Sequence, residues 1–118
     1  MITLSRNESD ILKKMRRDIV KGFLETFILT KLKNNTPLSG YDLIDIIPQQ
    51  FGFWLSPSTV YSALYRMERK GLIKTLCVSP FEGKKRVYTI TEEGKKLLLI
   101  NAKFEDSIVS LLRGIFVG

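Results

Sequence analysis

The segment from residue 56 to residue 71 constrains the fold more than any other part of the chain. Ser56 is a favourable N-cap, and Pro57 suits the first position of a helix, where its missing N–H would be unpaired anyway. Gly71, which follows two basic residues, is typical of the position just after a helix end. Between these signals, apolar residues recur at helical spacing: Val60, Ala63, Leu64 and Met67. The segment therefore predicts a short helix with one apolar face and well-defined ends.

A β-hairpin is expected directly after this helix. Residues 72–78 are apolar and partly alternating, and residues 86–90 are β-branched and aromatic, as strands usually are. Residues 79–85 between them contain Ser, Pro and Gly, which favour a turn. A helix that leads into a hairpin is one half of a small helical domain with a β wing.

The rest of the chain is predicted to be helical, with helices at 3–19, 23–33 and 39–47 and a last one from Glu92. Pro48 is expected to stop the third of these. Three helices followed by a hairpin form the winged helix-turn-helix arrangement, a mainly α fold with a small β-hairpin (α+β). We expect an N-terminal helical extension, a DNA-binding domain and a C-terminal dimerisation helix, at residues 1–22, 23–91 and 92–118.

Composition narrows the function. The net charge of +7 favours a polyanionic partner, and the basic residues are concentrated in two segments, 1–35 and 56–96. With no histidine and one cysteine, the chain cannot build a structural zinc site, an intramolecular disulfide or a nucleophile–histidine pair. We therefore expect no cofactor, no metal and no enzymatic activity. No apolar run is long enough to suggest a signal peptide or a membrane span, so a cytoplasmic location is expected, with no membrane partner.

The predicted helix at 57–70, here called the reading helix, carries a polar stripe opposite its apolar one. The candidate DNA-binding residues on or beside this stripe are Ser58, Thr59, Tyr61, Ser62, Tyr65, Arg66 and Arg69. Hydroxyls and backbone N–H groups near a helix start suit phosphate or base contacts. An ordinary solvated face would carry similar residues, and the sequence does not decide whether Arg66 reaches a base or a phosphate.

The expected hairpin adds a second basic element. Lys84, Lys85 and Arg86 are three consecutive cations at or beside its tip, where a wing touches the neighbouring DNA backbone or minor groove. Basic turns are common on proteins of many kinds. A basic helix followed by a basic hairpin is more specific than either element alone.

The last helix is predicted to form a dimer seam. Its apolar residues follow heptad-like spacings of three and four, and the helix at 23–33 is also rich in apolar residues. A chain of this length has little interior for both surfaces, so we expect a two-fold homodimer. The predicted interface residues are Phe23, Phe27, Leu97, Ile100, Phe104, Ile108, Leu111 and Ile115. The alternative is that this helix packs across its own domain.

Three motifs and a dipeptide make the chain resemble the PadR-type transcriptional regulators, named after the phenolic acid decarboxylase repressor. They are Lys-Gly at 21–22, GYDL at 40–43, PSTVYSALYRMERKGLI at 57–73 and KRVYTITEEGK at 85–95. The resemblance implies a winged-helix dimer that represses promoters and often releases DNA when a small molecule binds. It further implies membership of the small subfamily, which has a single C-terminal dimerisation helix. By the same resemblance Tyr61 would lie near the DNA backbone, and Gly40 and Tyr41 would be scaffold residues.

The chain also departs from that pattern. Ser58 and Ser62 stand where many relatives have Gly and Pro, and they add hydroxyls to the reading helix. Some relatives stack planar drugs between tryptophans of the last helix, but the single tryptophan here is Trp54, which is expected to anchor the core or the turn. A multidrug-sensing role is therefore not favoured.

The sequence as a whole predicts a sequence-specific regulator, most simply a repressor, that binds a pseudo-palindromic operator in double-stranded DNA. A small-molecule effector is compatible with this interpretation. The alternatives are a non-specific architectural DNA binder and a winged-helix module for a protein or RNA partner. The aromatic residues that could serve such a partner, and that are expected to be exposed, are Phe51, Phe53, Trp54 and Phe81.

Overall fold

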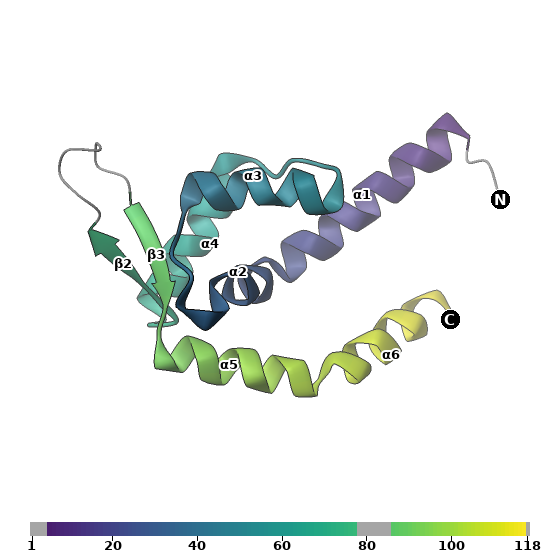
Figure 1. Ribbon diagram of the computed structural model, residues 1–118. Helices are drawn as coiled ribbons and strands as arrows, with labels where there is room; N and C mark the ends of the chain where they lie inside the picture. The colour runs from purple at the N-terminus through teal and green to yellow at the C-terminus, as the bar shows by residue number, and fades with distance from the viewer. Residues whose placement is uncertain (1–4, 78–85, 118) are drawn as a thin grey trace.

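The computed structural model describes residues 5–77 and 86–117 (Figure 1). The order of elements is α1 (Arg6–Gly22), α2 (Leu24–Leu32), the 3-10 turn η1 (Lys33–Asn35), β1 (Leu38–Ser39), α3 (Gly40–Phe51), α4 (Pro57–Arg69), β2 (Ile73–Cys77), β3 (Arg86–Ile90), α5 (Glu92–Lys103) and α6 (Glu105–Phe116). Three helices, α2 to α4, precede an antiparallel β2–β3 pair, which confirms the predicted mainly helical, winged helix-turn-helix fold.

The small sheet has one strand that the sequence did not predict. Its order is β1-β3-β2, and both pairings are antiparallel. β1 is two residues long and pairs Leu38 with Tyr88 and Ser39 with Val87. A strand this short has no periodicity to detect, and it forms because β3 offers a free edge. Ser39 then also caps α3, and it exchanges backbone and side-chain hydrogen bonds with Asp42.

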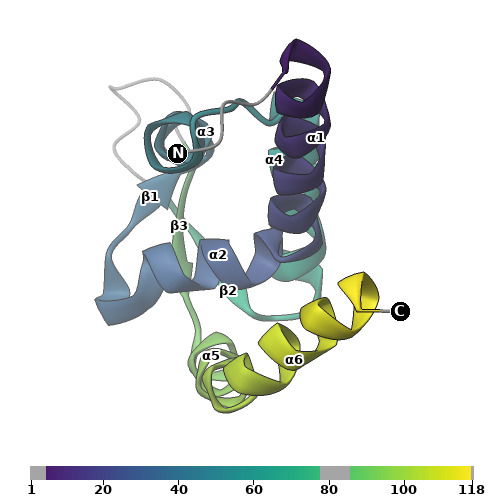
Figure 2. The same ribbon diagram turned by 90° about the vertical axis from the view of Figure 1, so that its right-hand side faces the viewer.

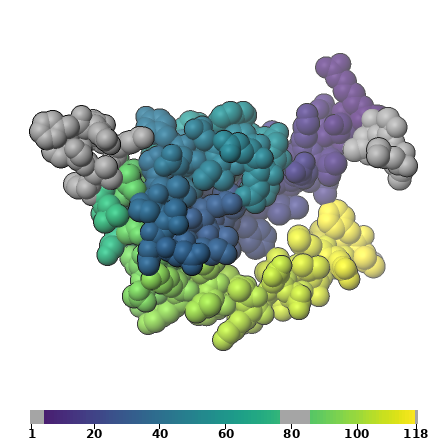
Figure 3. Space-filling view, in the orientation of Figure 1, coloured from purple at the N-terminus to yellow at the C-terminus, as the bar shows by residue number. Residues whose placement is uncertain are grey.

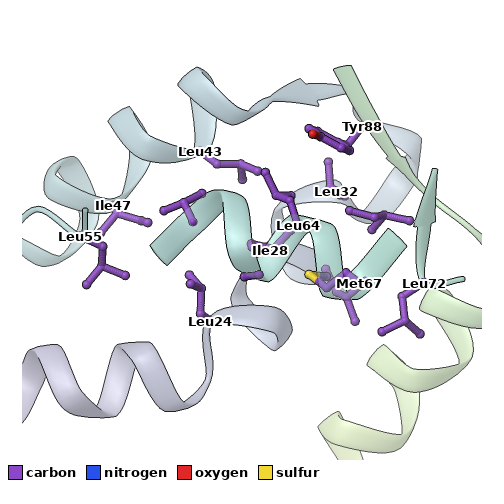
Figure 4. Close-up of a cluster of buried hydrophobic side chains, with 14 of the residues drawn as sticks. Leu24, Ile28, Leu32, Leu43, Ile47, Leu55, Leu64, Met67, Leu72 and Tyr88 are labelled. Carbon is purple, nitrogen blue, oxygen red and sulfur yellow. The ribbon is translucent and has the colours of Figure 1, made fainter. Parts of the chain in front are cut away.

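The core lies between α2, α3, α4 and the inner side of the β2–β3 pair (Figure 4). Each helix contributes residues three or four apart, so one face of each is buried. The buried apolar residues are Leu24, Ile28, Leu29, Leu32, Leu43, Ile47, Phe53, Leu55, Val60, Ala63, Leu64, Met67, Leu72, Ile73, Tyr88 and Ile90. The whole predicted apolar stripe of the reading helix, now α4, is among them. Burial of each large side chain stabilises the fold by roughly 1.5–3 kcal/mol.

Both ends of α4 are fixed by local chemistry. The hydroxyl of Ser56 accepts a hydrogen bond from the N–H of Thr59 at 3.2 Å. At the other end Gly71 adopts a positive φ of 75°, and the N–H of Leu72 donates to the carbonyl of Met67 at 2.9 Å. Thr91 then donates its hydroxyl to the carbonyl of Gly71 at 2.6 Å, which ties the start of α5 to the end of α4.

Besides the end of α1, which lies at Gly22 and not at residue 19, two predicted helix boundaries were wrong. Pro48 does not stop α3, which continues to Phe51. A proline one turn before a helix end removes one backbone hydrogen bond, but the last turn persists because Gly52 adopts a left-handed conformation and donates its N–H to the carbonyl of Pro48 at 2.9 Å. The ring of Phe51 also lies 5.2 Å from that of Phe27, which holds this turn on the core.

The second wrong boundary is in the C-terminal helix, which is not continuous. It breaks at Phe104 into α5 and α6, because Phe104 leaves the helical conformation with φ −104° and ψ 11°. Figures 1 and 2 show α6 bending away from α5, and Figure 3 shows α1 and α6 projecting from the same end of the molecule, opposite the β2–β3 pair. Neither α1 nor α6 contains a buried residue. None of the helices in the described ranges is long and apolar enough to cross a membrane.

Candidate nucleic-acid interface

The outer side of α4 gathers most of the predicted DNA-binding residues. Because the opposite side is buried, one exposed strip along the helix carries Ser58, Tyr61, Ser62, Tyr65, Arg66 and Arg69. These six residues, here called the reading face, line a shallow open depression on the surface. The predicted stripe is therefore present as one continuous exposed surface.

The hydroxyls at the start of α4 are partly occupied by the helix cap. The Oγ1 of Thr59 lies 2.7 Å from the Oγ of Ser56, and the Oγ of Ser58 lies 3.3 Å from it. Thr59 is half-buried and sits at the edge of the reading face, so it stabilises the cap more directly than it faces solvent. Ser58 and Ser62 are exposed.

Tyr61 is held on the reading face by the start of α3. Its ring meets the ring of Tyr41 edge-on, with centroids 6.5 Å apart and an interplanar angle of 84°. Burial raises the pKa of Tyr61 above its ordinary value, and the neighbouring Tyr41 and Tyr88 add to the rise. The phenol is therefore neutral near pH 7 and can donate a hydrogen bond to an anion. Tyr41 is exposed and supports Tyr61 from the side, while Gly40 is buried as expected for scaffold.

The cations of α4 differ in their partners. The guanidinium carbon of Arg69 lies 5.6 Å from the centre of the Tyr65 ring, a cation–π contact that keeps both side chains together on the surface. The Nε of Arg66 lies 3.8 Å from a carboxylate oxygen of Glu25, and the Nζ of Lys70 lies 3.2 Å from the other. Sequence reasoning missed Glu25, because an acidic residue in the first turn of a helix is ordinary and its partners are more than 40 residues away.

The basic hairpin can be followed only in part. Arg86 is exposed at the start of β3, opposite Cys77 in the register. Lys84, Lys85 and Phe81 lie outside the described residues. The wing contact therefore stays a prediction that rests on the sequence and on the position of Arg86.

The predicted interface residues fall into two groups. Phe27 and Leu97 are half-buried and pack against the core of their own chain. The others are exposed or half-exposed: Phe23, Ile100, Phe104, Ile108, Leu111 and Ile115. Phe23, Phe104 and Ile108 line a mainly apolar groove of about 780 Å³ that α2 forms with α5 and α6. α1 adds a second exposed apolar row at Ile11, Leu12, Met15 and Ile19.

The expectation that aromatic residues are exposed for a protein or RNA partner was wrong for Phe53 and Phe51. Phe53 is buried, and Phe51 is half-buried between the rings of Phe27 and Phe53. Trp54 has 63% of its surface exposed, which agrees with its expected exposure and excludes an anchoring role in the core. Its neighbours Phe53 and Leu55 supply that anchor instead.

Comparison with known protein families assigns the chain to one of them. Residues 28–99, more than half of its length, match the model of the transcriptional regulator PadR-like family. The chain belongs to this family. The match extends from α2 to the middle of α5 and so covers the reading face and the β2–β3 pair of this PadR-like regulator. Among curated proteins, none matches it.

Solved structures agree with the assignment. A PadR family transcriptional regulator from Eggerthella lenta is 24% identical, with a TM-score of 0.72, and the alignment covers 92% of this chain and 97% of that one. PadR from Bacillus subtilis, solved in complex with operator DNA, is 28% identical with a TM-score of 0.56. The same protein solved with p-coumaric acid is 29% identical with a TM-score of 0.52. These two alignments cover 64% and 66% of this chain but only 44% and 40% of the longer Bacillus chain.

Proposed function

We propose that this PadR-like chain is a homodimeric repressor that binds a specific operator in double-stranded DNA. The observation that carries the proposal is the reading face, on which six side chains able to bind phosphates or bases share one exposed side of α4. A helix of this kind, followed by a β wing, is the arrangement that enters the major groove of DNA.

The reading face offers two kinds of contact. The exposed hydroxyl of Ser58 at the start of α4 suits a phosphate, and the neutral phenol of Tyr61 can donate to one. Ser62 and Tyr65 lie on the middle of the face, where a helix seated in the groove approaches base edges. Lys84, Lys85 and Arg86 would contact the adjacent backbone from the wing.

The terminal helices support the proposed dimerisation. α1 and α6 have no buried residue, yet both carry exposed apolar rows and project from the same end of the molecule (Figure 3). A second copy that covers these rows would bury them and place two reading faces about 34–36 Å apart, one turn of DNA, on a pseudo-palindromic operator.

The relatives support the remaining parts of the proposal. Bacillus subtilis PadR has been solved with operator DNA and with p-coumaric acid, so one related chain is known with both DNA and a small organic acid. By analogy we infer that this regulator acts in the cytoplasm and responds to a small molecule. The groove that α2 forms with α5 and α6 is the natural place to test for such an effector.

A gel-shift titration at physiological salt tests the function. The probe is the duplex upstream of the chain's own gene, and the competitor is random duplex of equal length. We expect binding that survives the competitor, and we expect Ser62→Ala to reduce the preference for the probe. Equal displacement by random duplex would indicate an architectural binder, and no duplex binding by a folded protein would favour a protein or RNA partner.

A further inference from the structure

A carboxylate from α2 lies beside the cationic edge of the reading face. The Oε1 of Glu25 accepts a hydrogen bond from the Nζ of Lys70 at 3.2 Å, and its Oε2 lies 3.8 Å from the Nε of Arg66. Arg66 lies in the last turn of α4 and Lys70, four residues on, is its C-cap, so a single carboxylate reaches both.

A DNA phosphate that bound both cations would have to displace this carboxylate. Within residues 5–77 and 86–117, no other carboxylate lies within 4 Å of a cation of α4. The Glu25 side chain is 30% exposed, so it is open to competition from an incoming anion. Arg69, on the same helix, contacts the Tyr65 ring instead and keeps its charge available.

We propose that Glu25 competes with DNA phosphates for Arg66 and Lys70 and thereby favours the operator over random DNA. The inference rests on the proposed function and adds a residue that sets its specificity. Non-specific binding depends almost entirely on phosphate contacts and counterion release. A cation that already pairs with a carboxylate releases fewer counterions, so Glu25 weakens this mode most. Binding to the operator also draws on the exposed hydroxyls and on Tyr65 and Arg69, which Glu25 does not touch.

The test substitutes Glu25 with the nearly isosteric glutamine. Affinities for operator and random duplex are measured from about 50 to 300 mM salt, the range in which phosphate contacts weaken steeply. One additional free cation makes the slope of log affinity against log salt concentration steeper by about 0.9. At about 0.1 M salt this corresponds to roughly eightfold tighter binding of random duplex. We expect E25Q to bind random duplex about eightfold tighter or more, and operator less than threefold tighter.

Glu93→Gln is the matched control. It removes the same charge and frees a lysine, because Glu93 pairs with Lys96 at 3.4 Å, but it lies on α5 away from the reading face. If E25Q and E93Q changed random binding equally, net charge alone would explain the effect and the proposal would be overturned. A loss of operator affinity in E25Q with no change in salt slope would also overturn it, because Glu25 would then orient Arg66 for base contact.

A second test removes the two cations that Glu25 contacts. In a background that carries Arg66→Gln and Lys70→Gln, E25Q has no cation to free, so it should change random-duplex affinity less than twofold. A gain of about eightfold in that background, equal to the gain in the wild-type background, would contradict the role of Glu25. Failure of the wild-type protein to bind any duplex would instead contradict the proposed function itself.

Discussion

The ring of Tyr61 fills the space that a side chain at Gly40 would need. A Cβ atom added to Gly40 would lie 2.5 Å from Cε1 and 2.7 Å from Cζ of Tyr61, well inside van der Waals contact. The first residue of α3 therefore has to be glycine for the tyrosine of α4 to lie flat against it. This contact connects a buried scaffold position with an exposed residue of the reading face.

Gly40→Ala should displace Tyr61 and weaken DNA binding more than it weakens the fold. The colliding atoms are at the outer end of a half-exposed side chain that can swing away, so we expect a loss of about 1 kcal/mol in the free energy of unfolding. Urea denaturation and gel shifts on the same samples measure the two effects. Gly22→Ala is the control, because nothing lies within 4 Å of an added Cβ there. If the two variants bound DNA equally well, the contact would have no role in binding.

Tyr61 also predicts a pH dependence. Its pKa is raised in the folded protein above the value of 10.0 that describes the unfolded chain. Between these two values the unfolded chain has lost the proton and the folded protein has kept it, so stability falls as pH rises. The full contribution is present below pH 10. Urea titrations from pH 9 to about 11 should show a shallower decline for Tyr61→Phe than for wild type. Parallel curves would mean that burial does not perturb this phenol.

A substitution at Gly94 should be tolerated less well than one at Gly40. A Cβ at this position would collide with the carbonyl oxygen of Leu72, and it would come within 2.8 Å of the Ile90 side chain. The backbone cannot swing aside as a side chain can, so Gly94→Ala should lower the free energy of unfolding by roughly 2–3 kcal/mol. Gly114→Ala, in open space on α6, should be neutral or stabilising by up to about 1 kcal/mol. Thermal and urea unfolding of both variants would show whether α5 depends on this close approach.

The parts of the fold that the sequence predicted are those fixed by nearby residues. The start of α4 depends on Ser56 and Pro57, and its end depends on Gly71, all within one turn of the boundary. β3 matched its predicted range of 86–90 because its β-branched and aromatic residues lie between clear turn and cap signals. The reading face followed because its position depends only on the buried stripe of the same helix.

The parts that the sequence did not predict depend on distant residues. β1 exists only because β3 offers an edge, and α3 passes Pro48 because Phe51 packs on Phe27. The apolar spacing runs through Phe104 without a sign of the break there, since periodicity does not report the backbone angles of one residue. Glu25 joins α2 to α4 across 45 residues, as seen in its bond to Lys70, and no local pattern encodes such a pair.

The last prediction concerns the role of the terminal helices in dimerisation. Leu111 on α6 is 62% exposed in the single chain, so Leu111→Arg should change the stability of an isolated chain by less than about 0.5 kcal/mol. In a dimer that buries this row the same change places an unpaired charge in an apolar interface and should break the assembly. Sedimentation should then report a mass near 13.5 kDa instead of twice that value. Ser110→Arg adds the same charge at an exposed polar position of α6 and should leave the dimer intact. A dimeric Leu111→Arg protein would place the interface elsewhere, with the apolar row of α1 as the next surface to substitute.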